Sequence, residues 1–177
     1  THALGLLALL WLAAPLPAQV ITAAPDPQHP LLSAPVQAWA DGLAGAPLSA
    51  GNRLLLLENA VVSFPEKLAL VNGATQQVFL STMVASWDTT GRQMCDELGA
   101  AVARGVHARC ILDGQRSSPR LVRELRARGV QVALFNPWLS FGGRTGRFHQ
   151  KVVVADLRAA VAGGLNLSDA YNLGDGH

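Results

Sequence analysis

The chain has 177 residues, of which half are hydrophobic and 15% are charged, and its formal net charge is +2. This length and composition can support one ordinary domain with a buried core, and they exclude a wholly disordered protein. The small net charge predicts neither tight binding to nucleic acid nor avoidance of it.

The N-terminal part of the chain divides into an apolar run and a Pro-rich segment. Residues 3–14, ALGLLALLWLAA, are too few for a membrane span of about 20 residues, but they fit the hydrophobic region of a secretory signal peptide. Residues 1–19 are therefore predicted to be a signal peptide, with an uncleaved membrane anchor or a buried helix as the alternatives. Pro, Ala and small polar residues dominate 20–52, which we interpret as a linker or a loosely packed lead-in.

A regular alternation of strands and helices begins at residue 53. Strands are expected at 53–58, 77–84, 106–113, 130–136, 151–156 and 159–163, and helices at 61–72, 90–104 and 118–128. Thr90 can cap the second helix, and Gly105 and Gly129 can end the second and third helices. The alternation predicts an α/β fold with a mixed, mostly parallel sheet flanked by helices on both faces.

The chain has two cysteines, Cys95 and Cys110. They could form a disulfide in an exported protein. Their positions inside a predicted helix and a predicted strand favour two small buried apolar residues instead. Their number and spacing do not fit a zinc site.

The most informative segment runs from Phe148 to Tyr171 and reads FHQKVVVADLRAAVAGGLNLSDAY. It contains the pattern H-x-K-x-x-x-x-D, then six residues, then G-G-x-N, and the chain has one copy. The fixed positions are His149, Lys151, Asp156, Gly163, Gly164 and Asn166. Six fixed positions within a predicted strand-turn-strand unit are improbable by chance.

The first two positions of the pattern predict chemistry at phosphorus. His149 and Lys151 would project from one face of a strand, about 7 Å apart. A neutral imidazole is a nucleophile, and an ammonium can stabilise the charge on a non-bridging phosphate oxygen. The pair therefore predicts attack on a phosphodiester without a metal or cofactor. Taken alone, Lys151 would be interpreted as a solvated residue at a sheet edge.

The remaining positions have a structural interpretation beside the functional one. Asp156 ends the strand, where an aspartate commonly bonds a turn backbone, so geometry alone does not make it a catalyst. Gly163 and Gly164 lack Cβ atoms, which lets a backbone or a ligand approach. Asn166 can donate an amide N–H to a phosphate oxygen. Taken singly, the two glycines could form an ordinary turn and Asn166 could be a cap.

Residues outside the pattern could extend the site. Arg147, with Arg144 nearby, could contact a phosphate or a lipid headgroup, and a solvated loop arginine is the alternative. The apolar loop tip at 138–141 could face lipid or pack against the domain. Asp88 could line the pocket or cap a helix.

This arrangement resembles the phospholipase D superfamily, whose signature has the same H-x-K-x-x-x-x-D and G-G/S-x-N spacing. The likeness extends to segments that are similar to the first half of bacterial cardiolipin synthase-like members: WDTTG at 87–91, LDG at 112–114, LRARGVQVALFNP at 125–137 and NLSDAY at 166–171. The resemblance covers 53–177, which it implies to be a phospholipase D-like catalytic domain.

The resemblance implies roles for individual residues. His149 would be one of two histidines, of which one attacks phosphorus to form a phosphohistidine and the other protonates the leaving alcohol. Asp156 would complete the catalytic signature as the motif aspartate, usually viewed as structural. The residues implied to bind the phosphate are Lys151, Asn166, Gly163, Gly164 and Arg147.

Two features depart from the family pattern. A second motif is absent, so we expect it from residues beyond His177, since synthase-like members carry both copies in one chain, or alternatively from a homodimer. The acidic residue that orients the nucleophile has no confident match, and Asp169 and Asp175 are the candidates.

We therefore expect a bacterial, exported or membrane-associated enzyme of phospholipid metabolism. It would transfer a phosphatidyl group from a phospholipid at a membrane surface to an alcohol or to water. A secreted nuclease with the same histidine chemistry is the alternative, which the weak basic stripe disfavours. A phosphate- or lipid-binding domain without activity is the third possibility.

Overall fold

The computed structural model describes residues 19–21, 28, 30, 33–45, 51–137 and 146–172. Its contacts divide the chain into two compact units, and the boundary falls between Glu58 and Asn59. The apolar run at 3–14 lies outside the described residues, so the signal peptide stays a prediction. None of the helices in the described ranges has both the length and the hydropathy of a membrane span.

The smaller unit holds β1 (Gln19–Ile21), α1 (Ala34–Ala44) and β2 (Leu54–Leu56), and β1 pairs antiparallel with β2. The strand expected at 53–58 is therefore present, but it pairs with β1 instead of joining the main sheet. The segment interpreted as a linker contains a helix. Pro35 lies in the first turn of α1, where a missing backbone N–H costs no helical hydrogen bond, so the prolines did not exclude a helix there.

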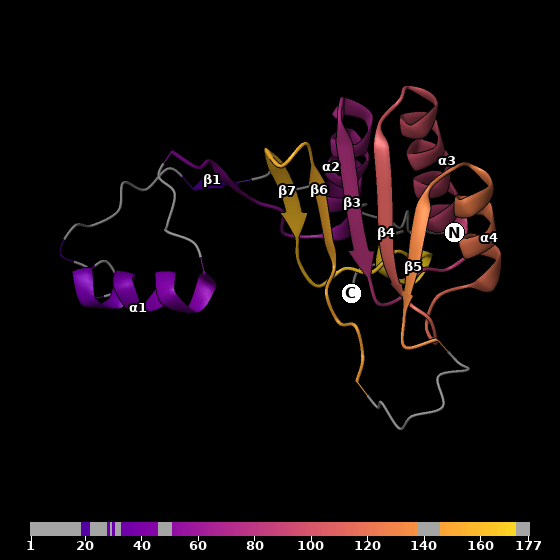
Figure 1. The fold of residues 1–177 in the computed structure, drawn as a ribbon. Helices are drawn as coiled ribbons and strands as arrows, with labels where there is room; N and C mark the ends of the chain where they lie inside the picture. The colour runs from indigo at the N-terminus through magenta and orange to yellow at the C-terminus, as the bar shows by residue number, and fades with distance from the viewer. Residues whose placement is uncertain are drawn as a thin grey trace, which may run out of the picture. The chain divides into compact units, whose positions relative to one another are not determined.

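The larger unit is a five-stranded sheet with packed helices (Figure 1). Its elements are α2 (Ala60–Gly73), β3 (Gln77–Thr82), α3 (Thr89–Ala103), β4 (His107–Asp113), α4 (Pro119–Ala127), β5 (Gln131–Phe135), β6 (Val152–Ala155), β7 (Ala159–Ala162) and α5 (Asp169–Asn172). Every element predicted for this unit is present among the described residues, with ends shifted by at most two residues. The short α5 was not predicted.

The strand order is β5-β4-β3-β6-β7. β3, β4 and β5 are parallel, whereas β6 is antiparallel to both β3 and β7. The predicted mixed, mostly parallel sheet is thus confirmed. Because β7 runs in the same direction as β3, the carboxyl ends of β3, β4, β5 and β7 and the amino end of β6 share one edge, called here the carboxyl edge (Figure 1).

Helices α2, α3 and α4 lie side by side and form one layer on the sheet. The strands direct alternate side chains into this layer, and Leu80, Cys110 and Val153 are all at most 3% exposed there. The connections through α3 and α4 step across the sheet in one direction, and right-handed crossovers then place both helices on the same face. Within the described part of the chain, the prediction of helices on both faces therefore holds for one face.

The ends of the helices follow local rules, with one correction. The N-cap of α3 is Asp88, whose Oδ1 accepts a hydrogen bond from the backbone N–H of Gly91 at 3.0 Å. The predicted cap, Thr90, is wrong, because Thr90 lies inside the first turn. Gly105 and Gly129 follow α3 and α4 with φ of +90° and +82°, which confirms them as the residues that end these helices.

Cys95 and Cys110 are both buried and unpaired. Burial raises the pKa of Cys95 to about 11 and that of Cys110 to about 12. The interpretation as two small buried residues is confirmed, and the disulfide alternative is not realised.

Candidate active site

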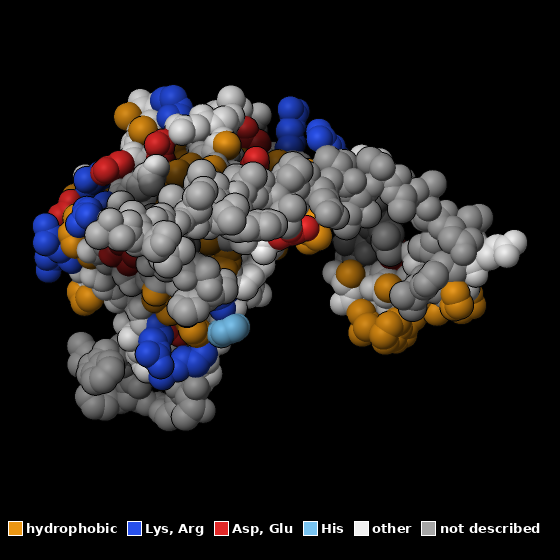
Figure 2. All heavy atoms as spheres, turned by 180° about the vertical axis from the view of Figure 1, so that it is seen from behind, with side chains coloured by type: hydrophobic (Ala, Val, Ile, Leu, Met, Phe, Trp, Pro, Cys, Tyr) orange, Lys and Arg blue, Asp and Glu red, His pale blue; other side chains and the backbone are white. Residues whose placement is uncertain are grey.

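The motif gathers at the carboxyl edge of the sheet, with the exception of Asp156. His149 and Lys151 directly precede β6, and the segment from Gly163 to Asn166 directly follows β7. Ligands of open α/β sheets bind at this edge, outside the carboxyl ends of the parallel strands. Figure 2 shows Lys and Arg side chains gathered with a histidine at the lower end of the sheet unit, which is the end that carries this edge.

Lys151 is buried at this edge. The pairing of β3 with β6 ends with Ser81 opposite Val152, and Lys151 directly precedes Val152. Its side chain is 6% exposed, and burial lowers its pKa. Nζ donates to the backbone carbonyl of His149 at 2.8 Å. An ammonium has three donors, so two remain for an incoming anion.

His149 is exposed and lies just outside the sheet. The segment from Gly146 to Lys151 is extended but not part of β6, which begins at Val152. Strict alternation of side chains is therefore not imposed on it. The structure places His149 and Lys151 at one edge, but not on the shared strand face that the sequence predicted, and their surroundings differ: the imidazole faces solvent and the ammonium is enclosed.

Asn166 is buried, and its amide is held in one orientation. Oδ1 accepts from the backbone N–H of Val84 at 3.1 Å and from the hydroxyl of Thr82 at 3.4 Å. Its backbone carbonyl accepts from Nδ2 of Asn172 at 2.5 Å. With Oδ1 occupied, the Nδ2 donors are the part of this side chain that can bind an oxyanion, and the phosphate contact of Asn166 stays a prediction.

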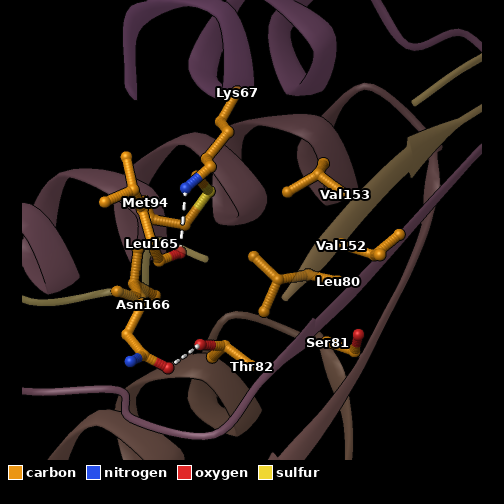
Figure 3. A pocket seen from close by; sticks show the side chains of 10 residues that line it. Lys67, Leu80, Ser81, Thr82, Met94, Val152, Val153, Leu165 and Asn166 are labelled. Carbon is orange, nitrogen blue, oxygen red and sulfur yellow. Dashed lines mark hydrogen bonds between the residues drawn. The ribbon is translucent and has the colours of Figure 1, made fainter. Parts of the chain in front are cut away.

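Asn166 lines a cavity of about 20 Å³ (Figure 3). Lys67, Thr82 and Met94 contribute to its walls. This volume suits about one water molecule. A phosphate would therefore have to be bound on the open side of the carboxyl edge and not in this cavity.

Lys67 reaches this cavity from α2 (Figure 3). It is 8% exposed, and burial lowers its pKa to about 8. Its Nζ donates to the backbone carbonyl of Leu165 at 3.1 Å, between the two glycines and Asn166. Lys67 therefore supports the loop that presents Asn166.

Gly163 and Gly164 face open space. A Cβ atom at either position would meet no atom within 4 Å among those that the structure describes. The backbone N–H of Gly163 donates to the carbonyl of Lys151 at 3.1 Å, which continues the pairing of β7 with the start of the motif. Among the atoms that the structure describes, this space is open, which leaves room for a ligand at this point.

Arg147 lies at the same edge with a side chain that is 44% exposed. Its NH1 donates to Oε1 of Gln115 at 2.5 Å and lies 3.9 Å from Oδ1 of Asp113. The guanidinium is thus held by the loop after β4 and still reaches solvent. Both of its predicted roles, contact with an anion and solvated loop residue, fit this placement.

Asp156 lies at the opposite edge of the sheet, about 16 Å from Lys151 along the strand. Its carboxylate accepts hydrogen bonds of 2.9 Å from the backbone N–H groups of Thr75, Gln76 and Gln77 and from the hydroxyl of Thr75. These bonds, above all the one from Gln77, hold the pKa of Asp156 well below its usual range. The structure does not bring Asp156 to the candidate catalytic group.

The carboxylate of Asp169, a candidate for orienting His149, is bonded to the start of α3. Its carboxylate accepts from the backbone N–H groups of Thr89 at 3.1 Å and Thr90 at 2.7 Å, and its own N–H donates to Oδ2 of Asp88 at 2.8 Å. Asp88 and Asp169 together cap α3, which supports the capping interpretation of Asp88. The other predicted candidates, Asp175, Arg144 and the loop tip at 138–141, lie outside the described residues.

The comparison with protein families decides the relationship. A family described as "Cardiolipin synthase, PLD-like domain" matches residues 68–174. The chain belongs to this family.

The chain is similar to one part of longer relatives in the cardiolipin synthase family. Cardiolipin synthase B of Shigella flexneri is 38% identical over 128 residues, and that of Escherichia coli K12 is 39% identical over 125 residues. The alignments cover 68% and 67% of this chain but 31% and 30% of the relatives. The chain thus spans about a third of the length of these curated relatives.

A solved structure has a fold similar to that of this chain. NucT from Helicobacter pylori superposes with a TM-score of 0.51 over 62% of this chain and 69% of that chain, at 17% identity. At this identity the likeness concerns the fold alone.

Sequence reasoning missed two residues of the site, Lys67 and Asp113. Their partners are remote in the chain, because Lys67 bonds Leu165 and Asp113 bonds Phe148. The rarity of lysine in the chain was a signal for Lys67. A charged residue at the end of an otherwise apolar strand was a signal for Asp113.

Proposed function

We propose that this chain carries one half of the active site of a phosphodiester-processing enzyme that acts on phospholipids. The reaction would be transfer of a phosphatidyl group to an alcohol or to water, with His149 as nucleophile. The observation that supports it most is the meeting of an exposed imidazole, an enclosed ammonium and an oriented amide at the carboxyl edge. The relatives named cardiolipin synthase B support the choice of phospholipid as substrate.

In the proposed reaction, a ring nitrogen of His149 forms a bond to phosphorus as the P–O bond to the leaving alcohol breaks. The alcohol oxygen takes a proton from a second histidine. That histidine then removes the proton of water or of an acceptor alcohol, whose oxygen forms the new P–O bond as the P–N bond breaks. His149 is regenerated, and no atom or electron is left unaccounted for.

The other groups of the edge stabilise charge that develops on the phosphate. Lys151 has two donors left beside its bond to His149, and Asn166 presents its Nδ2 donors. Fixed donors in a partly dry site stabilise the transition state more than water does, because they need no reorganisation. Arg147 adds a guanidinium that can contact the lipid headgroup or the surrounding anionic surface.

The second histidine has to come from a second motif, supplied either by further residues of the protein or by a second copy of the chain. Without a second histidine, the same residues would make a phosphate- or lipid-binding domain without activity. We propose a membrane surface as the place of reaction, because a phospholipid substrate resides there.

The test is turnover by the protein expressed over its whole encoded length. Vesicles of phosphatidylglycerol and a single-stranded oligonucleotide are offered in separate reactions, with ethanol as an acceptor, and products are identified by mass spectrometry. We expect phosphatidic acid or phosphatidylethanol from the vesicles and an unchanged oligonucleotide. His149→Ala should lower turnover by at least about a thousandfold, in line with the loss of a nucleophile.

His107→Ala is the matched control, since His107 is an exposed histidine at the opposite edge of the sheet. It should retain the activity of the unaltered protein. Cleavage of the oligonucleotide with untouched lipid would replace this proposal with a nuclease. Binding of vesicles without any product would leave only the phosphate- or lipid-binding domain.

A further inference from the structure

Asp113, the last residue of β4, is a fully buried carboxylate at the carboxyl edge, with an exposed fraction of 0%. Aspartate is almost never buried completely unless its oxygens are bonded. Oδ1 accepts from the backbone N–H groups of Gln115 at 2.9 Å and Arg116 at 3.2 Å. Oδ2 accepts from the backbone N–H of Phe148 at 3.2 Å, which joins the end of β4 to the residue directly before His149.

The sheet does not fix the backbone of His149. The pairing of β3 with β6 begins with Ser81 opposite Val152, three residues after His149. Among the described residues, the backbone bonds that flank His149 are the one from Phe148 N–H to Asp113 and the one from Lys151 Nζ to the carbonyl of His149. The imidazole is therefore carried by a peptide held on one side by a carboxylate and on the other by an ammonium.

The side chains before His149 are attached to the same region. Arg147 donates to Gln115 and lies 3.9 Å from Asp113 Oδ1. The ring of Phe148 lies 5.5 Å from the ring of Phe135 at the end of β5. Arg147 and Phe148 are thus attached to the ends of β4 and β5.

We propose that Asp113 is a positioning residue for His149. It fixes the N–H of Phe148 and the adjacent Arg147, and so sets where the imidazole stands relative to Lys151 and Asn166. Reactions at a bound phosphate are sensitive to a misplacement of about 1 Å. This role rests on the proposed function, because placement of His149 matters for catalysis only if His149 reacts.

Asp113→Asn tests the role with little change in volume. One oxygen of Asn can still accept from Gln115 and Arg116, but the amide nitrogen that replaces Oδ2 cannot accept from Phe148. Asp96→Asn is the matched control, because Asp96 is a 67% exposed carboxylate that pairs with Arg128 on the surface. NMR spectra of this chain would record the His149 ring, the His107 ring and the Phe148 amide, with inorganic phosphate as the titrated probe.

In Asp113→Asn we expect altered signals from the Phe148 amide and the His149 ring and an unchanged His107 ring. Binding of inorganic phosphate should weaken about tenfold, because the displaced Arg147 no longer gives the phosphate a charge-assisted bond. Asp96→Asn should change none of these. A folded Asp113→Asn protein with the signals and phosphate affinity of the unaltered chain would overturn the inference.

Hydrogen exchange decides the case in which Asp113→Asn does not fold. In the unaltered chain the amide of Phe148 should exchange slowly although it lies in an irregular segment, and fast exchange would contradict the bond to Asp113. Failure of the proposed function is a separate result: His149→Ala would then keep turnover, whatever Asp113→Asn does to the signals of His149.

Discussion

At the scale of single residues, the two lysines of the chain make the same kind of contact. Lys67 donates to the carbonyl of Leu165 and Lys151 to the carbonyl of His149, so each fixes a backbone carbonyl of the motif. Both are buried, at 8% and 6% exposure. A compact ammonium on a thin stem fits such a place better than a broad guanidinium, which gives a physical reason for two lysines in a chain with 12 arginines.

Lys67 gives the fold a measurable dependence on pH. Burial lowers its pKa from 10.5 to about 8, so between these values the unfolded chain binds more protons than the folded one, and stability rises with pH. We expect the free energy of unfolding of the unaltered chain to gain about 2 kcal/mol over Lys67→Met between pH 7 and 9.5. Denaturant titrations of both proteins at both pH values measure this difference.

Other groups titrate in the same range, and the comparison with Lys67→Met removes their shared contribution. A constant difference between the two proteins across this range would show that Lys67 is not enclosed as described.

At the scale of elements, the loop before β3 and the turn after β6 are held together by one carboxylate. Asp156 accepts from three successive backbone N–H groups at the start of β3. An aspartate after a strand was expected to bond its own turn, and the sequence pattern could not indicate a partner 80 residues away. Asp156 thus fixes the turn between β6 and β7 to the start of β3, and the opposite ends of β6 and β7 carry the site.

Asp156→Asn should destabilise the larger unit, because an amide nitrogen replaces one of the accepting oxygens. The folded-state pKa of Asp156 is lowered, so its contribution is present above the unfolded value near pH 4 and is lost as the pH falls below it. Thermal unfolding at pH 7 and pH 3 should show a clear difference between the two proteins at pH 7 and a smaller one at pH 3. Equal melting temperatures at pH 7 would count against the anchor.

Most elements could be predicted because their signals are local. Apolar strands and the left-handed glycines Gly105 and Gly129 set the limits of the main elements. The helix within 20–52 was missed because a proline in a first turn looks like a helix breaker. The single helical layer was missed because alternation along the chain does not show on which face each crossover packs.

At the scale of the whole molecule, His149, Lys151 and the segment from Gly163 to Asn166 meet at one edge, whereas Asp156 lies at the other, and the motif did not indicate the surroundings of these residues. The exposure of His149 and the enclosure of Lys151 depend on β6 starting at Val152, one residue after the lysine. Asp113 and Lys67 depend on contacts 35 and 98 residues apart along the chain. No periodicity reports such pairs, because they arise when the sheet brings its strand ends together.

The proposed chemistry also needs more than this chain contributes. One H-x-K motif supplies one histidine, and the chain spans about 30% of the length of its cardiolipin synthase relatives. Double displacement requires an acid that protonates the leaving alcohol and a base that activates the acceptor. One histidine that is bonded to phosphorus cannot fill these roles as well. The covalent intermediate is therefore the species that reports on His149 most directly.

Intact-mass spectrometry after rapid mixing with phosphatidylglycerol vesicles and a brief, mildly alkaline quench tests this claim, because the P–N bond and the acyl esters of the lipid both survive these conditions. The full-length protein should gain the mass of one phosphatidyl group, and peptide mapping should place it on His149. His107→Ala should keep the adduct and His149→Ala should lose it. An adduct that persists in a folded His149→Ala protein, or turnover with the adduct on another residue, would contradict the account.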